Sequence, residues 1–355
     1  MTRLNFSDVK DLTLPALQLM GCSESESNEV LDNLYLANLM GHDSHGVGMI
    51  PRYVESYLAG HLQPNQTIRV LNDLETLIVI DGGLGFGQTV GKQALDLAIQ
   101  RAARYGSCIF LLANAHHLGR IGGFAEIAAS KKMTSIFFVN VLSRPIVSVW
   151  GGTNGKHGTN PICVGVPRCG EPPFILDFAT SAVAQGKMRE AFIRKERVRE
   201  GLLKDSSGIG TTDPSVVVVP DGDGNFGSLF PFGEHKGSGL AIACELLAGA
   251  LSGGGAFKKE NLRDKAIVNN LFGVLVCIDK VQDFNVYGHE VEEFLAWVKQ
   301  DSNLSQEDHP LVAGEPEESR KNANERLGVD IPVETIEQIL ASITNLKRSS
   351  TTQKK

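Results

Sequence analysis

Short apolar runs alternate with helical patterns through the middle of this chain, and this alternation constrains the fold more than any other feature. Strands are predicted at residues 76–81 (TLIVID), 108–113, 135–141, 162–166, 174–178 and 272–278. Helical periodicity lies between or after most of them, at residues 90–105, 121–130, 182–199 and 239–251. Strands that alternate with helices are typical of an α/β protein.

The two ends of the chain have a different pattern. Residues 23–40 are predicted to form a helix, because Ser23 and Glu26 have capping-box spacing and Gly41 suits a helix stop. From residue 291 onward the chain is helical or polar, and it finishes in the sequence SSTTQKK. We therefore expect helical structure at both ends and a frayed tail over residues 346–355.

Charge and composition exclude several classes of protein. The 355 residues include 34 Lys plus Arg and 41 Asp plus Glu, a net charge of −7, whereas a nucleic-acid binder would show a basic surplus. The longest apolar stretches, such as residues 240–251, are shorter than the roughly 18–20 residues of a membrane span. The first twenty residues do not have the pattern of a signal peptide, and the six cysteines form no C-x-x-C pair. We predict a cytoplasmic protein that binds neither nucleic acid nor membrane.

The chain has 38 glycines, more than the roughly 25 that average usage gives. The run from Gly82 to Gly87, between a strand and a helix, suggests a turn that binds the phosphates of a dinucleotide. However, Gly85-x-Gly87-x-x-x-Gly91 has the wrong last spacing, and the next strand ends at Asn114 without an acidic residue. We interpret this run as a tight turn between strand and helix.

His45 lies in a polar loop, His42-Asp43-Ser44-His45-Gly46, that follows the first predicted helix. A histidine titrates near neutral pH and can transfer the proton in a carbonyl reduction or an alcohol oxidation. A purely structural loop histidine is the alternative. His42 and His45 lack a third ligand of suitable spacing, so we predict no metal site.

A second polar segment, from Asn114 to Gly122, follows a buried strand and opens a helix. Ligands of α/β proteins bind at such strand ends, and Arg120 with the first N–H groups of the helix would suit an anion. Lys236 precedes another apolar helix, where a lysine opposes the helix dipole unless an anion lies between them. These two places are the candidate anion sites, and a solvated loop is the alternative for the first.

Asp177 ends a predicted strand and could bind the hydroxyl pair of a ribose. Thr180 or Ser181 could instead be only the N-cap of the helix that follows.

Six segments, in order, resemble the type 2 malate/L-lactate dehydrogenase family, NAD(P)-dependent oxidoreductases unrelated to the Rossmann lactate dehydrogenases. They are GHDSHGVGMIPRYV (41–54), NAHHLGRIGGFAE (114–126), GTNPICVGVPR (158–168), FILDFATSAVAQGK (174–187), EHKGSGLAIACELLAGALSGG (234–254) and AGE (313–315). Within the family, GHDSHGVGMIP and HHLGRIGG are most similar to the hydroxycarboxylate dehydrogenase B, or hydroxyphenylpyruvate reductase, branch.

The resemblance implies an α/β (α+β) fold of the non-Rossmann, L-sulfolactate/malate dehydrogenase type. Residues 1–75 with 285–345 would form a helical part, and residues 76–284 an α/β part that binds cofactor and substrate. The resemblance further implies NAD or NADP as the cofactor and a homodimer in which each active site draws on both subunits.

The resemblance also assigns residues to roles. His45 would give a proton to the 2-oxo group, and His117 would polarise the same oxygen or orient the substrate. Thr159, in a matching segment, is expected beside the substrate. Cofactor contacts are implied for Gly119, Arg120, Ile121, Ile175, Leu176, Asp177, Phe178, Ala179, Thr180, Lys236, Asn269, Gly314 and Glu315.

One position departs from the pattern of many family members, which carry an arginine four residues after the catalytic histidine. Here that residue is Met49, so another side chain must bind the substrate carboxylate. Arg120 is the first candidate and Arg52 the second. A methionine also makes the pocket more apolar, which suits bulky or aromatic 2-oxo acids better than malate.

The leading hypothesis is an NAD(P)-dependent 2-hydroxycarboxylate dehydrogenase that reduces 2-oxo acids such as hydroxyphenylpyruvate, phenylpyruvate or oxaloacetate. One alternative is another branch of the family, with malate, lactate, ureidoglycolate, diketogulonate or a cyclic imine as substrate. The other is a non-catalytic binding protein on the same scaffold.

Overall fold

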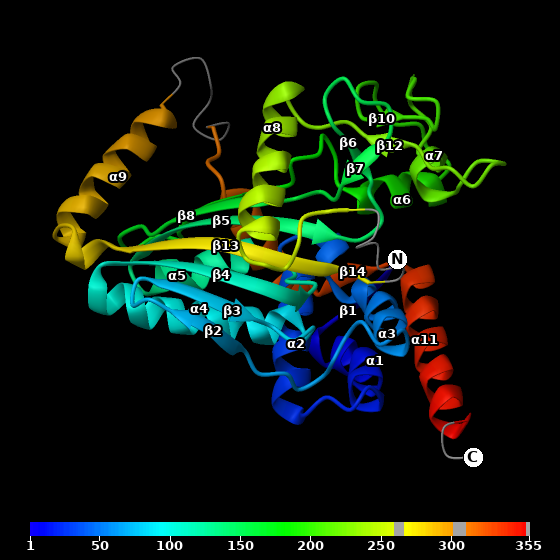
Figure 1. Ribbon diagram of the computed structural model, residues 1–355, viewed down its shortest axis with the longest axis horizontal. Coiled ribbons are helices and arrows are strands. Elements are labelled where there is room, and N and C mark those ends of the chain that lie inside the picture. The colour runs from blue at the N-terminus through cyan, green and yellow to red at the C-terminus, as the bar shows by residue number, and fades with distance from the viewer. Residues whose placement is uncertain (259–265, 301–309, 353–355) are drawn as a thin grey trace.

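A seven-stranded sheet runs through the centre of the computed structural model, which describes residues 1–258, 266–300 and 310–352 (Figure 1). Its strands, in spatial order, are β2 (Arg69–Asp73), β3 (Leu77–Asp81), β4 (Ser107–His116), β13 (Val268–Cys277), β5 (Met133–Leu142), β8 (Ile162–Val166) and β9 (Phe174–Phe178). Six of these confirm predicted strands, and β2 was not predicted. Only the β3–β4 pair of this sheet is parallel, so the alternation of strands and helices did not give a mainly parallel sheet.

The glycine run connects β3 to helix α4 (Gly87–Tyr105) and holds the end of β4. The N–H of Leu84 donates to the carbonyl of Asn114 at 2.7 Å, and the N–H of His116 donates to the carbonyl of Gly85 at 2.9 Å. A Cβ on Gly87 would lie 2.3 Å from the His116 carbonyl oxygen, so only glycine allows this approach. The run is a strand-to-helix turn, as predicted, and it braces the histidine segment.

Helices cover the two faces of the sheet unequally. Helices α4 and α5 (Gly122–Ser130) pack below it, over a core that includes Leu112 and Phe137 (Figure 1). Above it, α8 (His235–Cys244) continues as a π-helix, Glu245–Ala250, so the helix predicted at 239–251 starts earlier and changes its winding. Part of this upper face is uncovered: Ile136 is 38% exposed, and Phe138 and Phe272 are half-buried.

Segments from both ends of the chain form one helical unit, and its last helix continues past residue 346, where a frayed tail was predicted. Its main helices are α1 (Phe6–Leu19), α2 (Glu24–Leu39), α3 (Ile50–Leu58) and α11 (Val333–Thr352), which share a core that includes Leu17, Leu34, Tyr53 and Ile339. Strand β1 (Thr2–Leu4) pairs antiparallel with β14 (Val329–Ile331), with Thr2 opposite Ile331. Ser23 caps α2, but the carboxylate of Glu26 accepts the N–H of Asn65, so only half of the expected capping box forms.

A third unit, which the sequence did not predict, contains a five-stranded sheet in the order β11-β10-β12-β6-β7 (Figure 1, upper right). Its elements are β6 (Val147–Ser148), β7 (Gly155–His157), α6 (Gln185–Ile193), β10 (Leu203–Lys204), β11 (Gly210–Thr211), α7 (Ser215–Val218) and β12 (Ser228–Leu229). The helix predicted at 182–199 is too long, because Lys195 takes a left-handed conformation (φ 56°) and ends it.

Helix α6 of this small unit packs on the loop that carries His45, since a Cβ on Gly186 would lie 2.8 Å from Ser44 Cβ.

Two more helices complete the chain, α9 (Phe284–Val298) and α10 (Glu315–Leu327). Helix α9 lies at the end of the large sheet far from α11 (Figure 1). It exposes Phe294 and Trp297. In the described part of the chain, no helix combines the length and apolar character needed to cross a bilayer.

Candidate active site

One buried side chain of α2 fixes the loop that carries His45. Asn38 donates from Nδ2 to Asp43 Oδ1 at 2.6 Å, and its Oδ1 accepts the N–H of Val47 at 2.9 Å. A Cβ on Gly46 would fall 2.2 Å from Asn38 Oδ1, so the glycine lets the loop close over the amide. The loop folds into two short 3-10 turns, Asp43–His45 and Val47–Met49.

His45 and His117 lie against each other. The distance from His45 Nδ1 to His117 Nε2 is 3.1 Å, and the rings are parallel with centroids 5.2 Å apart. His117 follows the last residue of β4 and is buried, whereas His45 is half-buried. Burial, followed by the neighbouring His42 and Arg120, lowers the pKa of His45 to about 4, and burial also lowers the pKa of His117. Both rings are therefore neutral at pH 7, and one hydrogen lies between them.

The hydrogen-bonded chain continues inward from His117. Its Nδ1 is 2.8 Å from the hydroxyl of Tyr53 on α3, and Gln88 on α4 donates from Nε2 to that hydroxyl at 2.7 Å. Tyr53 is wholly buried, and burial raises the pKa of its hydroxyl. Sequence reasoning missed Tyr53 and Gln88; each is a polar side chain in the first turn of a helix, which the sequence does not mark as part of a site.

A small cavity lies between the His45 loop, which supplies His42, and the segment after His117, which supplies Arg120. About 20 Å³ in volume, it is lined by His42, Arg120, Glu126, Ile175, Asp177, Gly314 and Glu317. The buried guanidinium of Arg120 pairs with Glu126, with 2.6 Å between Nη2 and Oε2. Asp177 accepts the N–H of Gly122 at 2.7 Å, and burial raises the pKa of its carboxyl to about 6.

The groups that line this cavity suit a nucleotide chemically. A guanidinium can bind a phosphate or carboxylate, and a carboxylate can accept hydrogen bonds from ribose hydroxyls. The volume of about 20 Å³ accommodates one water molecule. Only an end group of a larger ligand would enter it without movement of the walls.

Several residues expected at the cofactor lie together here. Arg120, Ile175, Asp177 and Gly314 line the cavity, and Gly119 (φ 77°) makes the turn from His117 to Arg120. Ile121 is buried, and Ala179 is half-buried beyond the end of β9.

Two matching segments of the sequence are bonded to each other. The carbonyl of Thr159 accepts both the N–H of Thr180, at 2.9 Å, and its hydroxyl, at 3.0 Å. Phe178, just before, packs edge-to-face on Phe232 with ring centroids 5.4 Å apart.

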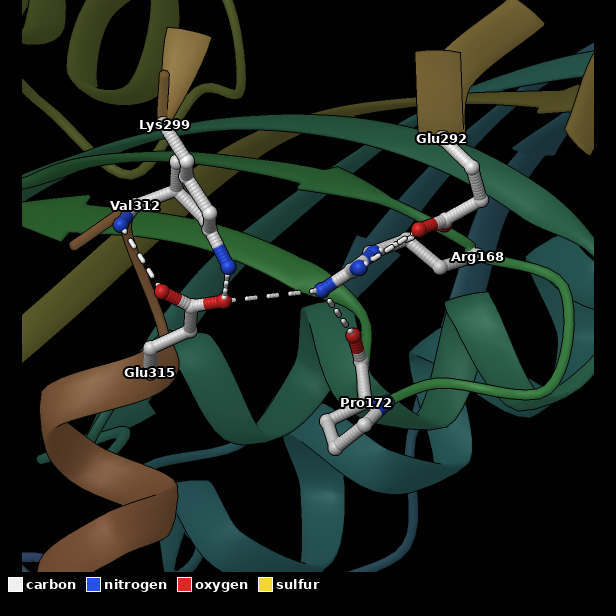
Figure 2. A network of polar contacts seen from close by, with 6 residues as sticks. All are labelled: Arg168, Pro172, Glu292, Lys299, Val312 and Glu315. Carbon is white, nitrogen blue, oxygen red and sulfur yellow. Dashed lines mark hydrogen bonds and ion pairs between the residues drawn. The ribbon is translucent and has the colours of Figure 1, made fainter. Parts of the chain in front are cut away.

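Asn269 and Glu315 use their polar atoms within the protein. Asn269 Oδ1 accepts the N–H of Leu118 at 2.9 Å, and its Nδ2 donates to the carbonyl of Asn140, so it supports the loop next to His117. Figure 2 shows Glu315 at the start of α10, between Lys299 and Arg168. Its carboxylate pairs with Lys299, lies 3.9 Å from Arg168 Nη1 and accepts the N–H of Val312.

Arg168 completes this network with a two-point ion pair to Glu292, at 2.8 and 2.6 Å (Figure 2). The network ties α9 and α10 to the turn after β8. It therefore holds Gly314 in the cavity wall.

Four predicted residues lie elsewhere. Lys236 is exposed in the first turn of α8, and no hydrogen bond or ion pair links its side chain to the rest of the described structure. Met49 packs against the core of the helical unit, and Arg52 is exposed and 3.6 Å from Glu55. Leu176 is 38% exposed on the edge strand β9.

Within residues 1–258, 266–300 and 310–352, no three His, Cys, Asp or Glu side chains are grouped to hold a metal ion.

Comparison with known proteins identifies the family. The malate/L-lactate dehydrogenase family matches residues 4–340. Hydroxycarboxylate dehydrogenase B of Escherichia coli K12 is 39% identical over 88% of this chain and 85% of its own length, and L-lactate dehydrogenase of Cupriavidus necator is 34% identical over 92% and 94%. The solved structure of sulfolactate dehydrogenase from Methanocaldococcus jannaschii superimposes with a TM-score of 0.84, at 29% identity over 98% of both chains. The resemblance seen in the sequence and the fold that it implied are confirmed.

Proposed function

This chain belongs to the malate/L-lactate dehydrogenase family, and from that premise we propose that it reduces 2-oxo acids to 2-hydroxy acids with NADH or NADPH. It is an oxidoreductase of hydroxycarboxylates, and its family uses a nicotinamide cofactor. The contact between His45 and His117 is the observation that carries the proposal, because it presents a proton-transferring group in the same loop as His42, which lines the cavity together with Arg120.

In the proposed reaction, the reduced nicotinamide supplies a hydride to the carbonyl carbon when it is bound. Arg120 binds the substrate carboxylate, and His45 gives a proton from Nε2 to the carbonyl oxygen, because its Nδ1 already faces His117. The pKa of His45 is about 4 without substrate. A bound carboxylate and the developing negative oxygen raise that pKa, so the substrate itself favours the protonated ring.

The substrate proposal covers hydroxyphenylpyruvate, phenylpyruvate and oxaloacetate. A panel of 2-oxo acids, each assayed with NADH and with NADPH and followed by chiral analysis of the product, tests this. Turnover of cyclic imines or of ureidoglycolate alone would move the protein to another branch. Cofactor binding without turnover on any acid would favour the non-catalytic alternative.

The general acid has its own test. We expect His45→Ala to lower kcat by about 10²–10⁴-fold, while quenching of NADH fluorescence still reports cofactor binding. Unchanged reduction of hydroxyphenylpyruvate by this variant would disprove the role of His45.

We also propose a homodimer in the cytoplasm. The uncovered upper face of the large sheet supports the dimer, because Ile136, Phe138 and Phe272 form an apolar surface beside the exposed Ile242 and Leu246 of α8 and its π-helical continuation. Exposed apolar surface of this kind is typical of an interface. All six cysteines are free thiols, which supports a reducing compartment.

A further inference from the structure

We propose that Gln88 is a positioning residue that sets the tautomers of His117 and His45 through the hydroxyl of Tyr53. This inference rests on the proposed role of His45 and extends it. Gln88 lies in the first turn of α4, two residues from the turn that braces the histidine segment, and its side chain is 4% exposed.

Only one of the two polar atoms of the Gln88 amide has a hydrogen-bond partner in the described part of the chain. Its Nε2 donates to the Tyr53 hydroxyl at 2.7 Å, whereas its buried Oε1 has no hydrogen-bond partner in the described part of the chain. A buried amide oxygen without a partner costs roughly 1–3 kcal/mol of stability. An apolar side chain at this position would avoid that cost, so packing alone does not explain an amide here. The orientation of the N–H group toward Tyr53 is therefore the feature that needs a role.

The orientation of the Gln88 amide determines which ring nitrogens of His117 and His45 carry hydrogens. The Tyr53 oxygen accepts from Gln88, so its own hydrogen is directed at His117 Nδ1, 2.8 Å away. His117 then carries its hydrogen on Nε2 and donates it to His45 Nδ1 across 3.1 Å. His45 in turn carries its hydrogen on Nε2, the nitrogen left for the substrate.

The opposite amide orientation reverses every bond. If Oε1 of Gln88 faced Tyr53, the hydroxyl would donate to the amide and accept from His117 Nδ1. His117 Nε2 would then accept from His45 Nδ1, and His45 Nε2 would present a lone pair. A protonated His45 carries hydrogens on both nitrogens and fits only this second arrangement. The orientation seen in the structure thus stabilises neutral His45, and rotation of the Gln88 amide accompanies its protonation.

The other titratable groups near the two rings affect the protonation of the histidines equally in both arrangements. His42 from the same loop, His116 at the end of β4 and Arg120 before α5 all disfavour a positive charge on the pair, and Tyr53 is neutral. None of His42, His116 and Arg120 forms a hydrogen bond with the Gln88 amide, whose partner is Tyr53, so the effect of a change at Gln88 can be separated from theirs.

Two variants of Gln88 test the proposal by opposite changes. In Gln88→Glu, a carboxylate of nearly the same shape can only accept from Tyr53, so we expect the hydrogens of both rings to move to Nδ1. In Gln88→Met, no group fixes the hydroxyl, so we expect a mixture of tautomers and a kcat lower by about 10-fold or more.

The measurement is ¹⁵N NMR of histidine-labelled protein without substrate or cofactor, which reports the tautomer of each ring directly. Nitrogen shifts of His117 that are the same in the wild type and in Gln88→Glu would overturn the proposal. The pH dependence of kcat/KM gives a second readout, and we expect Gln88→Glu to raise its acidic midpoint by about 1 pH unit. If neither the midpoint nor the tautomer changes in Gln88→Glu, Gln88 has only a packing role.

Gln93→Glu is the matched control. Gln93 lies on the same helix, and its Oε1 accepts the N–H of Ile68 at 3.0 Å, a bond that a carboxylate keeps. We expect it to add the same charge to α4 without moving either tautomer. The NMR readout needs no turnover, so it holds even if the substrate proposal fails, and melting temperatures of all three variants confirm that they fold.

Discussion

His116 is completely buried, and neither ring nitrogen has a hydrogen-bond partner among the residues that the structure describes. It packs edge-to-face on Tyr53 with centroids 5.5 Å apart, and burial lowers its pKa to about 3. His116 therefore lowers the stability of the protein at acidic pH. The unfolded chain binds a proton at this ring near pH 6.5, whereas the folded protein does not.

The sign of this effect sets a pH range. Between pH 6.5 and about 3 the unfolded state holds more protons at His116, so stability falls as pH falls. His42 and His45, each with a pKa lowered to about 4, add to the fall. Asp177, whose pKa is raised to about 6, opposes it between about pH 4 and 6.

We predict that His116→Leu makes the protein less sensitive to acid. The free energy of unfolding, measured in urea from pH 4.5 to 8, should fall less steeply below pH 6.5, by about one proton. At pH 8 the variant should be at least as stable as the wild type, because no hydrogen bond is lost. An unchanged pH slope would contradict the assignment of His116 as a neutral buried ring.

Arg120 and Arg52 offer a matched pair for the substrate carboxylate. Arg120→Met should raise KM for a 2-oxo acid by about 10- to 100-fold, since a charge-assisted hydrogen bond is lost, whereas Arg52→Met should leave KM unchanged. Steady-state kinetics with phenylpyruvate measure both. If instead Arg52→Met raises KM and Arg120→Met does not, the assignment is reversed.

The sequence was informative about single residues whose chemistry is local. His45 was singled out because it lies in a polar loop beside glycines, the family resemblance added His117, and the structure places the two rings in contact. Tyr53 and Gln88 were missed because their partners come from other elements and no spacing along the chain connects them. Asn269 was expected to contact the cofactor, but its amide accepts the N–H of Leu118 and donates to the carbonyl of Asn140. These partners also come from distant parts of the sequence.

At the scale of elements, the close contact between α4 and the histidine segment is a sensitive point. A Cβ on Gly87 would meet three backbone atoms, at 2.3 Å from His116 O, 2.5 Å from His117 O and 2.5 Å from Leu118 Cα. We predict that Gly87→Ala lowers the free energy of unfolding by about 1–3 kcal/mol and lowers kcat, because His117 must shift.

Gly239→Ala on α8 is the control for that substitution. No atom lies within 4 Å of a Cβ placed there, so the alanine should stabilise the protein by up to about 1 kcal/mol through helix propensity alone. Urea unfolding of both variants measures the difference. Equal stability of the two would mean that α4 can move away from the loop without cost.

Elements with strong periodicity were predicted well and short ones were not. Strands β8 and β9 match their predicted limits, β4 and β5 extend beyond theirs, and β13 starts four residues earlier and ends one residue earlier than predicted. The strands of the small unit are two or three residues long, so they carry no alternation that a sequence could reveal. Their pairing depends on contacts such as Leu203 opposite Leu229.

At the scale of the whole molecule, the uncovered sheet face predicts the oligomeric state. Wild-type protein should have about twice the 38.3 kDa mass of one chain by light scattering after gel filtration. Ile136→Lys, in the middle of the apolar face, should produce a monomer. Val219→Lys, on the exposed surface of the small unit, should leave the dimer intact, and a monomeric wild type would contradict the proposal.

The overall architecture was predictable only in part. Alternating strands and helices indicated the class, but the order of strands depends on β13 inserting between β4 and β5, from a segment more than 100 residues later. The position of the small unit against the His45 loop depends on the contact between Gly186 and Ser44, which also joins distant segments.

The pairing of β1 with β14 has a consequence for how this protein is made in a cell. The core of the helical unit needs Val329, Ile331 and Ile339 before it is complete, so it stays open until the ribosome has synthesised these residues. Asn38, which fixes the His45 loop, lies on α2 of that same unit. The large sheet likewise needs β13 between β4 and β5, so the nascent chain completes the sheet first and the helical unit that fixes the active site afterwards.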